Sequence, residues 1–161
     1  MIKSFYNLLQ RLVGENVDFI LVGGFAGVVY GSSYVTQDID ICCDFSVDNL
    51  FRLYKAIADL QPVHRMTPRK IKFRLTKVNA GQFKNLYLDT DMGQLDCLSF
   101  IEGVGDYQKV KQASDIIKFE NIKLRVLNLD NLIKAKQAMN RPKDRQIAIE
   151  LETIKKLKKK K

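Results

Sequence analysis

The stretch GGFAGVVYGSSYVTQDIDI, residues 23–41, decides how the rest of this sequence is understood. Its two glycines close an apolar run at residues 17–22, which is typical of a buried strand. The apolar residues 25–30 that follow predict a short helix, ended by Gly31 and two serines. Acid and isoleucine then alternate from residue 38, which predicts a second strand over 38–43.

The two aspartates of this second strand predict a cation site. Residues two apart on a strand point to the same face, so Asp38 and Asp40 project side by side. Like charges held together on a largely buried strand repel each other and lose hydration. A divalent cation removes both penalties, and carboxylates together with substrate phosphates are the usual ligands of Mg²⁺.

A third acid, Asp96, lies on another predicted strand, where Leu95 and a cysteine flank it. If that strand pairs beside residues 38–43, Asp96 faces the same site, and three carboxylates can hold two metal ions. A single acid is more often a turn or capping group, but the apolar neighbours here favour strands. Asp89 and Asp91 form a rival pair that ends at Gly93, and we interpret them as turn acids.

The glycine pair suggests a role next to the acids. A turn at Gly23 and Gly24, between a strand and a helix, lets phosphate approach backbone N–H groups at the helix start. Ser32 and Ser33 add hydroxyl donors. A tight turn without any ligand would explain the glycines equally well, and neither the Walker A pattern nor G-x-G-x-x-G is present.

Further elements follow from periodicity and from start and stop signals. We expect helices over 3–13, from a cap at Ser46 to about residue 60, from Asn128 or Asp130 through 139, and from Pro142 onward. We expect strands over 71–75 and 122–126, and a hairpin of 85–89 with 94–100. The sum is an α/β or α+β domain, with a mixed central sheet of about five strands flanked by helices.

Composition and charge limit the class of protein to which this chain can belong. The chain has 161 residues, of which 46% are hydrophobic and 28% charged, which is typical of one globular domain. We divide it into a single domain at 1–154 and a basic lysine tail at 155–161. The net charge is +9, and six of those positive charges are lysines of the tail.

A second basic cluster lies at residues 65–74 and contains Arg65, Arg69, Lys70, Lys72 and Arg74. Basic clusters attract phosphates, so nucleic acid binding through this cluster and the tail is one interpretation. The other is a solvated surface and a frayed helix end, which we favour for the tail.

Localisation is predicted from cysteines and hydropathy. Three cysteines, with no disulfide or zinc spacing, favour a reducing cytoplasm. Residues 1–19 carry acids and lack the unbroken apolar run of a signal peptide, and no stretch is long enough to span a membrane. The single histidine, His64, follows Pro62 and is expected on a surface loop without a catalytic role.

The combination of these motifs resembles a known signature. Residues 23–24, 30–32 and 36–40 (GG, YGS and TQDID) resemble that of the polymerase-beta-like nucleotidyltransferase superfamily, especially its small stand-alone bacterial members. Residues 90–96 are similar to the hairpin that carries the family's third carboxylate. Residues 131–136 and 140–144 are similar to its C-terminal helix pair. The resemblance covers about residues 17–150 and implies a nucleotidyltransferase-like fold.

The resemblance also implies an activity: transfer of a nucleoside monophosphate from an NTP, such as ATP, to a hydroxyl acceptor, with release of pyrophosphate. It implies that Asp38, Asp40 and Asp96 are catalytic and bind Mg²⁺ or Mn²⁺, with Asp96 also a candidate general base. The implied nucleotide-binding residues are Gly23, Gly24, Ser32, Ser33, Thr36, Lys136 and Lys143.

One departure from the family concerns phosphate binding, because Tyr34 stands where members often carry an arginine. The acceptor stays open among a small antibiotic, an RNA end and a protein hydroxyl. Two other classes also stay open: a non-catalytic nucleic-acid-binding module, and an interaction protein such as a toxin with an antitoxin-like partner.

Overall fold

The computed structural model describes residues 2–160. Two 3₁₀ turns, at Ala58–Leu60 and Ala80–Gln82, accompany the regular elements. Those elements are, in chain order, α1 (Ile2–Gly14), β1 (Phe19–Val22), α2 (Gly23–Val29), β2 (Asp38–Cys43), α3 (Val47–Ile57), β3 (Val63–His64), β4 (Asn85–Thr90), β5 (Gly93–Leu98), β6 (Phe100–Ile101), β7 (Gly105–Asp106), α4 (Tyr107–Gln112), β8 (Ser114–Phe119), β9 (Ile122–Leu127), α5 (Leu129–Met139) and α6 (Pro142–Lys159).

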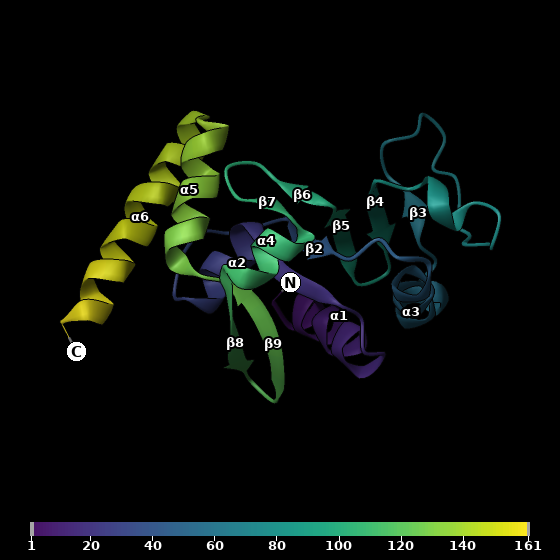
Figure 1. Cartoon of the computed structure of the whole chain (residues 1–161), viewed down its shortest axis with the longest axis horizontal. Helices are drawn as coiled ribbons and strands as arrows, with labels where there is room; N and C mark the ends of the chain where they lie inside the picture. Colours follow the sequence, from purple (N-terminus) through teal and green to yellow (C-terminus); the bar gives the residue numbers. More distant parts are fainter. Residues whose placement is uncertain (1, 161) are drawn as a thin grey trace.

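The main sheet has seven strands in the order β3-β4-β5-β2-β1-β9-β8, and β6 and β7 form a separate pair. It is mixed, because β2 runs parallel to β5 and β1 parallel to β9, whereas the other neighbouring strands are antiparallel. The predicted mixed sheet with flanking helices is therefore confirmed, with two strands more than expected. Figure 1 shows α5 and α6 at one end of the long axis and β3 at the other.

The core forms where the predicted apolar faces meet. Helix α1 buries Phe5, Leu8, Leu9 and Leu12, one stripe at helical spacing, and packs against α3. All four residues of β1 are buried, as expected for a central strand. Burying one such leucine contributes about 1.5–3 kcal/mol. We expect Leu8→Ala to cost about 2–5 kcal/mol, because the Leu8 side chain is fully buried and its loss leaves a cavity.

The predicted helix caps are present. At the start of α3, the Ser46 side chain accepts a hydrogen bond from the backbone N–H of Asn49. At the start of α5, the Asn128 side chain accepts a hydrogen bond from the backbone N–H of Asn131. Asn128, rather than Asp130, is thus the cap. Pro142 occupies the first turn of α6, where its missing N–H costs nothing. Helix α6 continues to Lys159, so most of the predicted lysine tail is helical.

Two segments differ from the sequence prediction. The expected strand at 71–75 is wrong: it forms only an isolated bridge between Lys72 and Val63. Its alternation is real, since Phe73 and Leu75 are buried, but it meets β3 at this single bridge and is not one of the seven strands of the main sheet. Conversely, the sequence prediction missed β8, which lies at the edge of the sheet. Its Ile116 is 64% exposed, so the strand lacks the alternation of a buried face.

No helix within residues 2–160 combines the length and the apolar character needed to cross a membrane.

Candidate active site

Three carboxylates converge on one face of the paired strands β2 and β5. These strands pair in parallel with Asp40 opposite Asp96, and Asp38 shares the face of Asp40. One oxygen from each of Asp38, Asp40 and Asp96 lies within 4.8 Å of the others. The pairing of the two strands, on which the predicted three-acid site depended, is therefore present.

The site concentrates negative charge. Burial, and then repulsion by Asp38 and Asp96, raises the pKa of Asp40 to about 7. Burial, and then the neighbouring Asp96, also raises the pKa of Asp38. Three clustered carboxylate oxygens are hard ligands of the kind that Mg²⁺ and Mn²⁺ prefer. The residues present therefore fit a divalent cation, which would relieve the repulsion that raises these pKa values.

Arg65 is bound to the third carboxylate. Its Nη1 and Nη2 donate to Oδ1 and Oδ2 of Asp96 at 2.6 and 2.9 Å, a bidentate pair. The two side chains are only 21% and 10% exposed. The Arg65 backbone N–H also donates to the Tyr87 carbonyl at 2.8 Å. The sequence indicated Arg65 only as part of a basic cluster, and no local signal points to this partner.

The glycine pair sits directly at the acids. Gly23 has a φ of +70°, and a Cβ at this position would overlap Oδ2 of Asp40. A Cβ at Gly24 would lie 3.1 Å from Cβ and Oγ1 of Thr36. Thr36 in turn donates from Oγ1 to the Asp38 carbonyl at 3.0 Å. The predicted strand-to-helix turn is therefore confirmed, and it lets the loop before β2 pack against the start of α2.

Ser32 and Ser33 are held by α6 rather than aimed at the acids. The Ser32 hydroxyl donates to Oε1 of Glu150, which also accepts the Ser33 backbone N–H at 3.0 Å. The Ser33 hydroxyl donates to Oε2 of Glu150 at 2.9 Å. These bonds lower the pKa of Glu150. Both serines line a cavity shared with α1, which contains none of the three acids.

The buried carboxylate of Asp144 forms ion pairs with a lysine of α5 and with the arginine that precedes α6. The Asp144 side chain is only 1% exposed. It accepts hydrogen bonds from Nε and Nη2 of Arg141 at 2.5 and 3.3 Å. Nζ of Lys136 lies 3.6 Å from it. Hydrogen bonding from Arg141 lowers the pKa of Asp144, so its charge is retained and fixes both cations. The spacing of Arg141 and Asp144 by three residues is visible in the sequence, whereas the contact of Asp144 with Lys136 depends on how α5 and α6 pack.

Lys143 lies beside Tyr34. Its Nζ is 5.8 Å from the centre of the Tyr34 ring, within the range of a cation–π contact. Both residues line the same cavity as Asp38 and Asp40. The α6 helix thus supplies a cation next to Tyr34 in this cavity.

Two cavities meet at Asp40. The first, which we call the cationic cavity, has a volume of about 280 Å³, and its polar lining residues include Thr36, Asp38, Lys136, Arg141 and Lys143. The second, the apolar cavity, has a volume of about 390 Å³, and its lining includes Val22, Leu98, Phe100, Ile101, Leu127 and Met139. Asp40, Lys136 and Arg141 line both.

Comparison with known proteins yields matches among solved structures alone. No family model matches the chain, and no curated protein gives a significant match. Among solved structures, a Thermotoga maritima protein with a provisional nucleotidyltransferase assignment aligns with a TM-score of 0.56 at 17% identity, covering 99% of this chain and 93% of that one. The chain has a nucleotidyltransferase-like fold.

A second protein with this nucleotidyltransferase-like fold is the antibiotic-resistance factor ANT(2'')-Ia. Its solution structure aligns with a TM-score of 0.56 at 11% identity, covering 99% of this chain and 91% of that one. Its crystal structure with adenylyl-2''-tobramycin aligns with a TM-score of 0.55 at 12% identity, over 96% and 95% of the two chains. The fold implied by the sequence resemblance is thereby confirmed.

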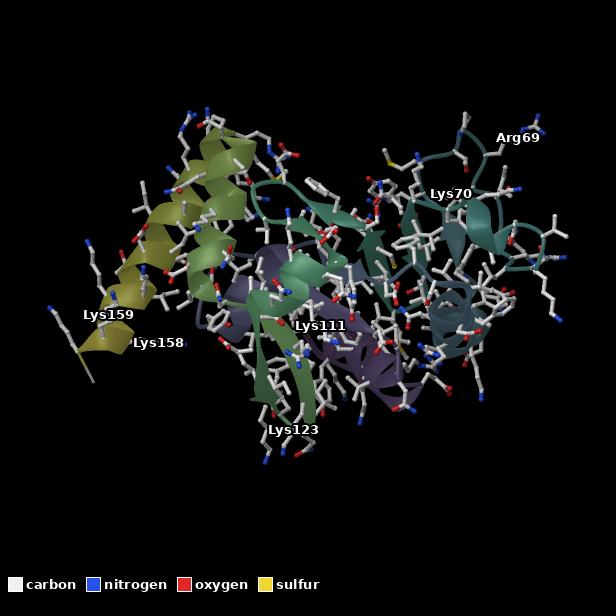
Figure 2. The ribbon with its side chains drawn as sticks, in the orientation of Figure 1. Arg69, Lys70, Lys111, Lys123, Lys158 and Lys159 are labelled. Atoms are coloured by element: carbon white, nitrogen blue, oxygen red, sulfur yellow. The ribbon has the colours of Figure 1, made fainter. Side chains whose placement is uncertain are left out.

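Within this nucleotidyltransferase-like fold, the two basic segments lie far apart. Figure 2 shows Arg69 and Lys70 near one end of the long axis, and Lys158 and Lys159 near the other. Two members of the 65–74 cluster are also paired: Arg65 with Asp96, and Lys70 with Asp89 at 3.2 Å. The two segments therefore do not form one continuous basic surface.

The remaining candidates lie outside the acid site. Asp89 belongs to β4 and Asp91 to the turn before β5, and neither is part of the acid cluster found among residues 2–160. His64 is half-buried and packs against the rings of Phe73 and Phe83, rather than lying on an open loop. All three cysteines are free and buried, as small hydrophobic residues usually are.

Proposed function

We propose that this protein is a metal-dependent nucleotidyltransferase, which transfers a nucleoside monophosphate from an NTP to a hydroxyl acceptor and releases pyrophosphate. One observation carries the proposal: the carboxylate oxygens of Asp38, Asp40 and Asp96 lie within 4.8 Å of one another, on a chain with a nucleotidyltransferase-like fold. Solved structures that are 11–17% identical to this chain support the fold. The three carboxylates supply the metal-binding groups that the reaction requires.

The carboxylates would hold Mg²⁺ or Mn²⁺. Bound there, a divalent cation supplies charge neutralisation for the triphosphate and a lower pKa for the attacking hydroxyl. Asp38 and Asp40 present adjacent oxygens from β2, and Asp96 closes the set from β5. Arg65 donates to both oxygens of Asp96, and because each carboxylate oxygen keeps a second lone pair, Asp96 can still serve as a metal ligand.

The triphosphate would occupy the cationic cavity. Lys136 and Arg141 are held in place there by Asp144, so little side-chain freedom is lost when phosphate binds. Lys143 has no carboxylate partner among the ion pairs of residues 2–160, and its charge is free for a phosphate. Gly24 and Thr36 form the wall beside the acids. Ser32 and Ser33 are left out of the proposed site, because Glu150 engages them.

A labelling experiment tests this function. The protein is incubated with Mg²⁺, cell extract and each NTP labelled at the α-phosphate, beside Asp38→Asn, Asp40→Asn and Asp96→Asn. We expect transfer of label by the wild type and a loss by each variant of about a hundredfold or more. Asp91→Asn, in an exposed turn, is the matched control and should keep full activity. No transfer from any NTP, or equal transfer by Asp40→Asn, would contradict the proposal.

No specific observation favours the other function classes. A nucleic-acid-binding module that used the basic cluster and the lysine tail together would need them on one surface, whereas they lie at opposite ends of the molecule (Figure 2). An antitoxin-like partner, a cytoplasmic location and a bacterial origin stay predictions from the sequence.

A further inference from the structure

We propose that the acceptor is a neutral or anionic hydroxyl compound with an apolar body of about one ring system, and that it binds in the apolar cavity. This inference rests on the proposed function and adds to it the chemical class of the second substrate. Four features carry it: where the cavity lies, what lines it, how it is charged and how large it is.

The position of the apolar cavity follows from the geometry of phosphoryl transfer. In an in-line displacement, the attacking hydroxyl and the leaving pyrophosphate lie on opposite sides of the phosphorus atom. The two cavities meet at Asp40, Lys136 and Arg141. If the triphosphate occupies the cationic cavity, the apolar cavity, which shares Asp40 with it, is the neighbouring space from which the hydroxyl can approach.

The lining of this cavity suits an apolar molecule. Phe100 and Met139 line it although they are 57% and 46% exposed, and no part of residues 2–160 covers these surfaces. Leu98, Leu127 and the Tyr87 ring form further walls. A concave apolar site with a few polar groups is the usual form of a small-molecule pocket. Asn85 and Glu102 are the polar groups away from the acids.

The charge of the cavity disfavours a polycation. Among the described residues that line it, only Asp40 and Glu102 are acidic, while Lys136 and Arg141 are basic. With Asp40 committed to the metal, a single carboxylate remains. A polyamine such as tobramycin would bring several ammonium groups, and most of them would be desolvated without a carboxylate partner. A neutral or anionic acceptor avoids this cost.

The size of the cavity sets the scale of the acceptor. A volume of about 390 Å³ lies near the lower end of small-molecule pockets and holds one ring system with its substituents. We therefore expect a free small molecule to be labelled, rather than a protein or a folded RNA.

Fractionated extract tests the chemical class even while the acceptor is unidentified. Cell extract is separated by ultrafiltration at a cut-off of about 3 kDa, and the small-molecule part is divided on a cation exchanger and on a reversed-phase column. Each fraction, and tobramycin as a polycationic probe, is incubated with the protein, Mg²⁺ and α-labelled NTP. We expect label in the reversed-phase fraction and none in the cation-retained fraction or in tobramycin.

Two cavity variants locate the binding site. Phe100→Ala and Met139→Ala should each lower labelling by about fivefold or more at limiting reversed-phase fraction, with unchanged thermal stabilisation by Mg-NTP. Met66→Ala, 71% exposed and outside the cavity, is the matched control and should label like the wild type.

The outcomes separate this inference from the function on which it rests. Label in the macromolecular fraction, in the cation-retained fraction or in tobramycin would overturn the acceptor class while leaving nucleotidyl transfer intact. A loss of Mg-NTP stabilisation in Phe100→Ala would also overturn it, because the cavity would then hold the nucleobase. Absence of label in every fraction, with no Mg-NTP stabilisation of the wild type, would instead refute the proposed function.

Discussion

Arg65 and Asp96 form a two-pronged ion pair at the acid cluster, with nitrogen–oxygen distances of 2.6 and 2.9 Å. The arginine supplies one positive charge where three carboxylates meet. It therefore offsets part of their repulsion before any metal binds, and its planar fork fixes the orientation of Asp96. Protein stability and metal binding are consequently coupled at this pair.

Arg65→Gln should destabilise the metal-free protein by about 2–4 kcal/mol, because it leaves a mostly buried carboxylate without its partner. Excess Mn²⁺ should recover much of this loss, since the cation takes over the neutralising role. Urea unfolding with EDTA or with Mn²⁺ measures both effects. Arg69→Gln, which removes the same charge from an exposed loop, should change little. Equal losses with and without Mn²⁺ would contradict the coupling.

The raised pKa of Asp40, about 7, predicts how the stability of the metal-free protein depends on pH. The folded state binds this proton more tightly than the unfolded chain, where the pKa is about 4. The stabilisation is therefore complete below about pH 4 and is lost as pH rises to about 7, by an amount on the order of 4 kcal/mol. Urea unfolding in EDTA at several pH values, with wild type and Asp40→Asn, measures it.

The Asp40→Asn profile should be flatter than that of the wild type, and saturating Mg²⁺ should restore wild-type stability above about pH 7. A variant profile parallel to the wild type would show that Asp40 does not carry the pH dependence.

Gly23→Ala should lower stability by about 2–4 kcal/mol and weaken metal binding, because the new methyl group would displace the Asp40 carboxylate and strain a positive φ. Calorimetric titration with Mn²⁺ and thermal unfolding report the two effects. At Gly14, by contrast, an added Cβ meets nothing within 4 Å, so Gly14→Ala should be neutral or slightly stabilising. Unchanged Mn²⁺ affinity in Gly23→Ala would argue against this contact.

Glu150→Gln should cost about 1–2 kcal/mol of stability, because it weakens the hydrogen bonds that fasten Ser32 and Ser33 to α6. It should leave the affinity for Mg-NTP unchanged, since these serines are not part of the proposed phosphate site. A double-mutant cycle with Ser33→Ala measures the coupling. A large drop in Mg-NTP affinity for Ser33→Ala would instead restore the phosphate role predicted from sequence.

Lys143→Ala should raise the Kd for Mg-NTP about tenfold, or about 1.4 kcal/mol, because it removes a cation of the cationic cavity that has no carboxylate partner among residues 2–160. Fluorescence titration with a labelled ATP analogue measures the change, which should shrink at high salt. Lys123→Ala, on the strand β9 far from α6 (Figure 2), is the charge-matched control. Equal effects of the two substitutions would mean that only net charge matters.

The strands and caps near the site were predictable because each is encoded by its neighbours in sequence. Alternation at 38–43 specified both the strand β2 and the shared face of Asp38 and Asp40. The hairpin around Gly93 was predictable from two runs of strand-favouring residues separated by a turn. Periodicity failed at 71–75, where the alternation is genuine but the segment pairs with the two-residue strand β3 at a single bridge only.

The sequence by itself determined the local elements, the faces of the acid-bearing strands and the resemblance to nucleotidyltransferases. Only the tertiary structure decided which groups meet across distance: Arg65 with Asp96, 31 residues apart, and Glu150 with Ser33, 117 residues apart. The same holds for the cavities on either side of Asp40. The physical reason is that backbone periodicity is set by nearby residues, whereas side-chain partners depend on how whole elements pack.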